Sequence, residues 1–183
     1  MGDYPCPPEG VSTLITLRDS IRIRATPEQL FKWLESMPQE YVSWHPDHVA
    51  CRALKGSMLQ VGSEVECQEY LHGKLHSMRF RPMRVDPGRR MEYEIIALGK
   101  GAFEAVPKDE EIEFVAELHL GSNTPIVGRL IDAALRAFFS RRLEAMRQHT
   151  LEEGQNLKRI IESGWKPRAI PDPATKSAYN RSL

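Results

Sequence analysis

With 183 residues, the chain has the length of a single domain with a sizeable hydrophobic core. Basic and acidic residues number 25 each, and a net charge of zero argues against a nucleic-acid surface or a general attraction to anionic membranes. No apolar run approaches the roughly 20 residues of a membrane span. The cysteines Cys6, Cys51 and Cys67 lack CxxC spacing, which favours free thiols and a cytoplasmic location.

A strand and two short helices are predicted first along the chain. Ile21 and Ile23 alternate with arginines, as in a strand with one buried face. The segment 26–29 predicts a helix start, because a threonine cap, a proline at the first helical position and a glutamine three residues after the cap form a capping box. This helix stops before Pro38. A second short helical piece ends at His45, which precedes a proline.

Five further strand-length segments follow, separated by turn signals. The predicted strands are 49–54, 62–70, 74–85, 89–97 and 111–120. The glycine-rich stretch 99–107 is predicted to be a loop. Short successive strands with tight turns indicate an antiparallel meander.

A long helix is predicted over 126–163, where apolar residues recur at helical spacing. The apolar stripe contains Leu135, Phe139, Leu143, Met146, Leu157 and Ile160. His149 and Glu153 fall into this stripe and lie one above the other, four residues apart. Buried ionisable groups are costly unless they are paired, hydrogen-bonded or bound to a metal. The pair therefore indicates either a metal site or an intrahelical pair at a helix edge that faces water.

This order of elements resembles the START-like helix-grip superfamily, which includes polyketide cyclases, aromatase-like proteins and plant pathogenesis-related ligand binders. The resemblance is carried by segments 21–31, 54–56 and 61–65 and covers residues 15–163. It implies an α+β helix-grip fold, in which a curved antiparallel sheet wraps around a long C-terminal helix and two short helices follow the first strand. The cavity between sheet and helix implies a hydrophobic or aromatic small-molecule ligand.

The predicted domain boundaries follow from this assignment. They are a flexible leader 1–10, a single helix-grip domain 11–164 and an extended tail 165–183. The apolar first part of the long helix, 126–139, could also support a homodimer interface.

Two further regions offer metal donors. The segment 41–48 holds aromatic residues and two histidines at the entry to the predicted meander. On the strand 62–70, Glu69 shares parity with Val65 and Cys67, so it faces the cavity if they do. The alternatives are histidines that cap backbone groups and a solvated glutamate. Cys51 and Cys67 could also bind a metal from adjacent strands, although core packing is the commoner role of cysteine.

The pattern Tyr-x-x-Trp-His-Pro-Asp-His over 41–48, followed by His-x-x-x-Glu, resembles the 2,4-diacetylphloroglucinol hydrolase family. Those enzymes hold zinc in a helix-grip domain and cleave a carbon–carbon bond between an acyl group and a phloroglucinol ring. The resemblance implies the metal ligands His48, Glu69, His149 and Glu153. It also implies that Tyr41 lines the substrate pocket. The interval between the His-Pro pair and His48 is one residue shorter than in that family.

The sequence therefore predicts a metal-dependent hydrolase that acts on a carbonyl or acyl-aromatic small molecule, including a β-diketone-like substrate. Zinc suits the histidine and carboxylate ligands, and iron or manganese would accept similar ones. The resemblance implies attack of hydroxide on the carbonyl and loss of a stabilised carbanion, with Tyr41 or His45 as hydrogen-bond donor or acid. A metal-free carrier for a hydrophobic molecule and a metal-free cyclase or aromatase are the alternatives.

Overall fold

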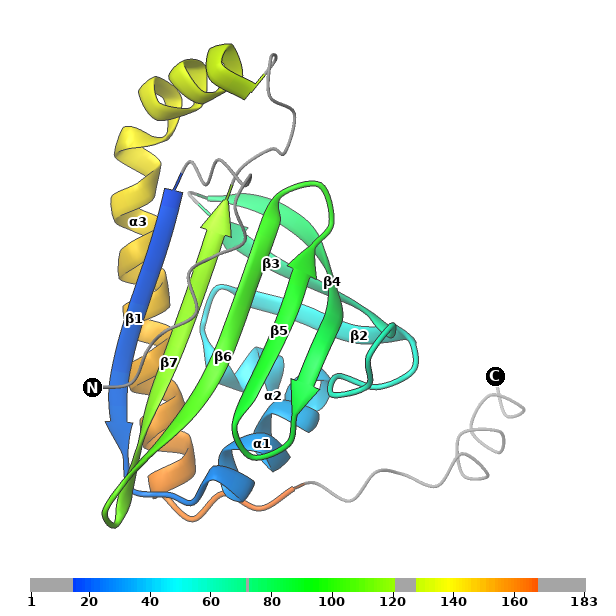
Figure 1. Ribbon diagram of the computed structural model, residues 1–183, viewed down its shortest axis with the longest axis vertical. Helices are drawn as coiled ribbons and strands as arrows, with labels where there is room; N and C mark the ends of the chain where they lie inside the picture. The colour runs from blue at the N-terminus through cyan, green and yellow to red at the C-terminus, as the bar shows by residue number, and fades with distance from the viewer. Residues whose placement is uncertain (1–14, 72, 121–127, 168–183) are drawn as a thin grey trace.

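The computed structural model describes residues 15–71, 73–120 and 128–167, and between 128 and 145 the only side chain that it describes is that of Glu144. These residues form seven strands and three helices (Figure 1). In chain order they are β1 (Ile15–Ile23), α1 (Pro27–Glu35), α2 (Met37–Trp44), β2 (His48–Lys55), β3 (Glu64–Leu71), β4 (Lys74–Asp86), β5 (Arg90–Ile95), β6 (Gly99–Lys108), β7 (Glu111–Leu120) and α3 (Gly128–Glu162).

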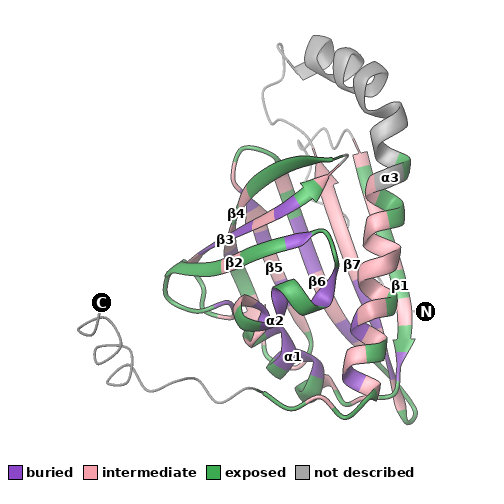
Figure 2. Cartoon of the chain, turned by 180° about the vertical axis from the view of Figure 1, so that it is seen from behind, coloured by how far each residue is buried: buried purple, intermediate pink, exposed green. Residues whose placement is uncertain are grey.

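The strands form one antiparallel sheet in the order β1-β7-β6-β5-β4-β3-β2. The chain therefore runs as a meander from β2 to β7, and β1 pairs with β7 at the far edge. Figures 1 and 2, seen from opposite sides, place all three helices over one face of the curved sheet. This arrangement confirms the predicted α+β helix-grip fold.

The turn into α1 forms as the sequence predicts. The Thr26 side chain accepts a hydrogen bond from the backbone N–H of Gln29, and the Gln29 side chain accepts one from the backbone N–H of Thr26. This capping box satisfies two backbone donors that the first helical turn leaves free. The following helix, α2, ends at Trp44, and only three residues separate it from β2. The connection is short enough to fix His48, the first residue of β2, beneath α2.

The hydrophobic core lies where α1, α2 and the second half of α3 meet the sheet. Its fully buried members include Ile23, Leu30, Trp33, Leu34, Met91 and Leu157. Burial of each such side chain stabilises the fold by about 1.5–3 kcal/mol. The buried positions in Figure 2 gather around α1, α2 and the facing strands. The candidate metal-binding histidines that follow α2 therefore lie against the packed core.

The prediction of a loop over 99–107 is wrong, because these residues form β6, which pairs with both β5 and β7. The glycines were the signal for a loop, but Gly101 lies directly across from Tyr93. A methyl group at position 101 would overlap the Tyr93 ring. The glycine therefore makes room for a buried aromatic side chain and does not mark a turn.

The long helix agrees with its predicted range, and α3 contains 35 residues. Of its predicted apolar stripe, Leu157 is buried and Met146 is half-buried, whereas Leu135, Phe139 and Leu143 lie outside the described side chains. The leader 1–10, the tail beyond residue 167 and the side chains of the candidate dimer stretch 126–139 also lie outside them. Among the described helices, none is long and apolar enough to cross a membrane.

Candidate metal centre

His48 lies at the point where the α2–β2 connection enters the sheet, and its side chain is completely buried. Its Nδ1 atom lies 2.9 Å from the backbone carbonyl oxygen of Tyr41. A carbonyl only accepts hydrogen bonds, so Nδ1 carries the proton and Nε2 is left with a free lone pair. The Tyr41 ring stacks on the imidazole with a centroid distance of 3.8 Å and an interplanar angle of 4°. Together these contacts fix both the tautomer and the direction of Nε2.

Glu69 lies on β3 directly across from His48. It is buried on the same side of the strand as Val65 and Cys67, which agrees with the parity prediction. The Tyr41 hydroxyl donates a hydrogen bond of 2.6 Å to its Oε2 atom. This short bond holds a buried carboxylate next to the His48 ring, with its negative charge partly compensated.

His149 and Glu153 reach the same place from α3. The spacing of four residues puts both side chains on the face that covers the sheet, and their exposed fractions are only 11% and 18%. The indole N–H of Trp44 donates a 2.9 Å hydrogen bond to the backbone carbonyl of Glu153. This bond ties α2 to α3 at the turn that carries the pair.

These four side chains, His48, Glu69, His149 and Glu153, form a compact quartet. The distances from each histidine Nε2 to the nearer Glu69 and Glu153 oxygens are 3.1, 3.5, 3.7 and 3.9 Å. Ligands about 2.0–2.1 Å from a tetrahedral zinc ion lie about 3.4 Å apart, so the spread matches a ligand cage.

The strongest indication of a missing partner comes from the two imidazoles. Both Nε2 atoms, of His48 and His149, are buried, and within the described chain neither has a hydrogen-bond partner of acceptable geometry. Unsatisfied buried polar atoms are rare in folded proteins and point to an unseen water or ion. Two such nitrogens beside two glutamate side chains fit a divalent metal, and the buried histidine and glutamate cluster can hold one.

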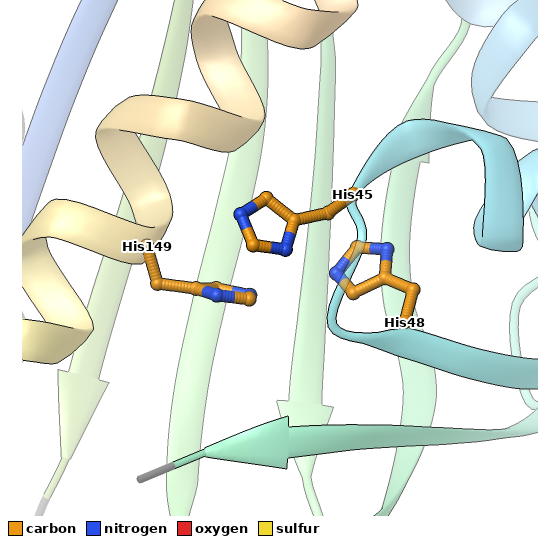
Figure 3. Close-up of side chains that lie close together, drawn as sticks. All are labelled: His45, His48 and His149. Atoms are coloured by element: carbon orange, nitrogen blue, oxygen red, sulfur yellow. The ribbon is translucent and has the colours of Figure 1, made fainter. Parts of the chain in front are cut away.

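His45 also reaches the cluster but is held differently (Figure 3). Its ring lies 4.1 Å from that of His149 between centroids. Its Nδ1 atom accepts a hydrogen bond from the Asp47 backbone N–H, and its Nε2 atom lies 3.2 Å from a carboxylate oxygen of Glu152. Both ring nitrogens therefore have partners already, and no lone pair is left for a metal. His45, His48 and His149 also lie close enough together to form a three-histidine group. In that group both nitrogens of His45 already have partners, whereas each histidine of the quartet has an Nε2 atom without one.

Burial determines the protonation of the quartet. It is the main cause that lowers the pKa of His48 and His149 to about 4, and the neighbouring imidazoles contribute to the lowered pKa of His149. Burial also raises the pKa of Glu153 to about 8, and burial together with the nearby Glu153 raises that of Glu69. At neutral pH both imidazoles are therefore uncharged, as metal ligands must be, and Glu153 carries a proton that a cation would displace.

The quartet borders a cavity of about 130 Å³ between the sheet and α3. Tyr41, Glu69, His149 and Glu153 contribute to its wall, whereas His45 does not. The rest of the wall is mostly apolar and includes Met37, Met58, Met78, Phe80, Tyr93 and Phe103. A cavity of about 150 Å³ with such a lining accommodates benzene, so the space suits one aromatic ring.

The structure thus brings all six predicted site residues together, and it adds two that the sequence reasoning missed. Glu152 holds His45, and Trp44 holds the backbone at Glu153. Trp44 belongs to the recognised segment 41–48, but its partner lies 109 residues away. Glu152 falls on the solvent side of the helix stripe, where a glutamate gives no signal by itself.

Fold and site together define a helix-grip protein with a small apolar cavity and a buried histidine and glutamate cluster. Residues 15–151 match the family described as polyketide cyclase / dehydrase and lipid transport. The match spans well over half of the chain, which therefore belongs to this family. A comparison with curated proteins gives no match. For the finer resemblance of the 41–48 motif to 2,4-diacetylphloroglucinol hydrolases, the only structural support among the described residues is the possible histidine and glutamate metal cluster.

Solved structures with the same fold are distant in sequence. The protein TTHA0849 from Thermus thermophilus is 15% identical, with a TM-score of 0.61 over 82% of this chain and 100% of that one. The polyketide-cyclase-like Cgl2372 from Corynebacterium glutamicum is 21% identical, with a TM-score of 0.53 over 80% and 91%. The Zhui aromatase/cyclase from Streptomyces sp. R1128 is 14% identical, with a TM-score of 0.53 over 83% and 99%. At these identities the likeness concerns the fold and not the activity.

Proposed function

We propose that the protein is a metal-dependent hydrolase of a carbonyl or acyl-aromatic small molecule, with zinc held by His48, Glu69, His149 and Glu153. The observation that carries this proposal is the pair of unpartnered, buried Nε2 atoms beside two buried carboxylates at the wall of an apolar cavity. A cavity that only binds an apolar ligand has no need of a buried cluster of four ionisable side chains, three of them at its wall, because their burial costs free energy.

A zinc ion, when bound, polarises a carbonyl group and makes water more acidic. The residues of the chain prepare the site for this chemistry. His48 and His149 offer neutral nitrogens, and the Tyr41 hydroxyl keeps Glu69 in place. Tyr41 lines the cavity and is the better placed donor toward a substrate oxygen, whereas His45 does not line the cavity and its Nε2–H is directed at Glu152.

The cavity limits the substrate to a compact molecule. Its apolar wall and its volume suit a single aromatic ring or a short β-diketone, whose carbonyl would face the polar side formed by Glu69, His149 and Glu153. Cleavage of the carbon–carbon bond beside that carbonyl is the reaction that the resemblance of the motif implies. The aromatic ring would then leave as a stabilised carbanion that takes up a proton.

Elemental analysis of protein purified without an affinity tag or a chelator tests the proposal. We expect close to one zinc ion per chain and hydrolysis of an acyl-phenol or a β-diketone that stops when the metal is chelated. His149→Ala should lose the metal, whereas the matched control His119→Ala, which changes a histidine bonded to Thr16 at the β1–β7 pair, should keep it. Wild-type protein that takes up no divalent metal on titration would refute the proposal.

A metal-free carrier is the second candidate, because the wall is mostly apolar and the family description includes lipid transport. The family binds hydrophobic small molecules, and a carrier would bind such a ligand equally well with and without a chelator. The third candidate is a metal-free cyclase, since one structural relative is an aromatase/cyclase. Turnover that persists in the presence of a chelator would favour that reading.

A further inference from the structure

Two cysteines lie directly opposite each other on adjacent strands near the quartet. Cys51 on β2 pairs with Cys67 on β3, and their sulfur atoms are 2.8 Å apart. Opposite residues in an antiparallel pair have Cα atoms about 4.5 or 5.5 Å apart, and both separations lie within the range of about 4.4–6.8 Å found for disulfides. A bond between the two sulfurs therefore needs no change in strand register.

The two thiols differ in accessibility. Cys67 is completely buried and lines the cavity, whereas Cys51 is half-buried on an edge strand of the sheet. A small oxidant can thus reach Cys51 from the solvent side. The thiol of Cys67 is already directed at that sulfur, to which it donates a hydrogen bond. This combination of one accessible and one resolving cysteine is typical of reversible redox pairs.

We propose that Cys51 and Cys67 form a redox-active dithiol that a hydroperoxide converts into a reversible cross-strand disulfide. The Cys51 sulfur attacks the O–O bond, which gives a sulfenic acid and releases an alcohol or water. The Cys67 sulfur then displaces the hydroxyl group as water and closes the S–S bond. Two thiols are oxidised in this sequence, and one hydroperoxide is reduced.

The disulfide would brace the edge of the sheet that carries half of the quartet. His48 and Glu69 are opposite partners on the same two strands, three residues from Cys51 and two residues from Cys67, respectively. Within the sheet β2 is paired with β3 alone, so a covalent link closes the β2–β3 hairpin into a ring. A cross-link of this kind stabilises the folded state because it restricts the unfolded chain. The proposal does not depend on the proposed hydrolase activity.

The test uses the reduced full-length chain, exposed to hydrogen peroxide and followed by intact mass spectrometry. We expect the loss of two hydrogen atoms, a Cys51–Cys67 link in the peptide map, a raised thermal midpoint and full reversal by dithiothreitol. Cys6→Ser is the matched control and should behave like the wild type. Cys51→Ser and Cys67→Ser should each fail to lose the two hydrogens.

Three results would overturn the proposal. The first is a gain of oxygen atoms with no disulfide, which would show that the sulfurs oxidise independently. The second is a disulfide that involves Cys6. The third is a Cys51–Cys67 disulfide that leaves the thermal midpoint unchanged, which would show that the bond does not stabilise the β2–β3 edge of the sheet.

Discussion

His48 shows how this fold prepares a single side chain for a ligand role. Its Nδ1–H is bonded to the Tyr41 carbonyl, and its ring is stacked between α2 and the sheet. Metal-binding histidines commonly use their second nitrogen in this way, because the hydrogen bond fixes the tautomer and the orientation of the ring. The free Nε2 atom consequently faces Glu153 and Glu69 at 3.1 and 3.5 Å.

The Tyr41 hydroxyl should matter for metal affinity although it is not itself a ligand. Tyr41→Phe removes the 2.6 Å bond to Glu69 and leaves the carboxylate free to turn away from His48. We expect the affinity for zinc to fall about 10-fold, as for other changes next to a ligand. Competition with a chromophoric chelator measures it. Tyr93→Phe, which alters the same cavity wall, should leave the affinity unchanged, and an equal loss in both variants would contradict the prediction.

The pKa values of the quartet predict a stability optimum for the metal-free protein. The pKa of His48 and His149 in the folded state is about 4 and the ordinary value is 6.5, so the unfolded chain binds more protons and stability rises between these pH values. The pKa of Glu153 is about 8 and the ordinary value is 4.5. The folded state therefore holds an extra proton, and stability falls as the pH rises through this window.

Below pH 6.5 the two histidines outweigh Glu153, and above it their effect fades while that of Glu153 continues. We expect the free energy of unfolding to peak near pH 6.5 and to decline by about 0.8 kcal/mol by pH 8. Urea unfolding of chelator-treated protein over this range measures the decline. Glu153→Gln should abolish the decline above pH 6.5 and keep the rise below it. A decline that persists in this variant would assign it to other groups.

At the scale of single residues, the sequence predicts the face on which a candidate ligand lies where one periodicity places it. His149 and Glu153 follow from the helical repeat, and Glu69 follows from the alternation of a strand. The contacts that hold the ligands could not be predicted, since the bond from Trp44 to the Glu153 carbonyl joins residues whose proximity depends on the packing of α2 against α3. The periodicity of a sequence predicts which face of a helix or strand a residue lies on, but not which other element packs against that face.

Among the elements, α2 and α3 depend on one side chain for their alignment. Trp44→Phe removes the indole N–H that donates to the Glu153 carbonyl. We expect a loss of about 0.5–1.5 kcal/mol in the free energy of unfolding, because one hydrogen bond between the two helices is lost while the carbonyl keeps its bond within α3. Zinc affinity should fall as well.

The matched control is Trp33→Phe, because the buried Trp33 indole has no hydrogen-bond partner among the described residues. This variant removes the same volume and no hydrogen bond, so it should keep the zinc affinity of the wild type. Urea unfolding and chelator competition on both variants separate the two effects. Equal losses of zinc affinity would mean that ring volume, and not the bond to Glu153, aligns the helices.

β6 shows where element prediction from sequence fails. The capping box, the two short helices and the long helix follow from local signals, whereas the glycines of 99–107 resemble loop residues until Tyr93 is placed beside them. Gly101→Ala should therefore destabilise the protein by about 1–3 kcal/mol, since the new methyl group must displace a buried ring. Gly154→Ala in α3 meets only ordinary contact and should stabilise by about 0.5–1 kcal/mol. Thermal unfolding compares the signs, and a stable Gly101→Ala variant would contradict this packing.

At the scale of the whole molecule, the candidate metal centre joins parts of the chain that are far apart in sequence. His48 comes from the start of β2, Glu69 from β3, and His149 and Glu153 from α3. The unfolded chain cannot present this set, so a metal held by it would bind only the folded state and stabilise it. At a free concentration about 1,000 times the dissociation constant, the gain is about 4 kcal/mol. The metal would thus link α3 to strands β2 and β3 at the wall of the cavity.

Replacing the helix half of the quartet separates the metal centre from a simple carrier cavity. His149→Leu with Glu153→Leu removes two buried ionisable groups and fills their place with apolar side chains. We expect the metal-free variant to be as stable as the metal-free wild type or more stable, because the cost of burying these groups disappears. Zinc should raise the thermal midpoint of the wild type and not that of the variant.

The control for this experiment changes a matched pair on the same helix. Glu144 and Gln148 are also four residues apart and are exposed, so Glu144→Leu with Gln148→Leu alters the helix without touching the quartet. This control should keep the full zinc-dependent rise in the thermal midpoint. Its metal-free form should not become more stable through the loss of buried ionisable groups, because both residues that it replaces are exposed. Differential scanning calorimetry with zinc and with a chelator compares all three proteins. A zinc-dependent rise that survives in the His149→Leu, Glu153→Leu variant would place the metal elsewhere, and the quartet would then be a buried polar network at the wall of a carrier.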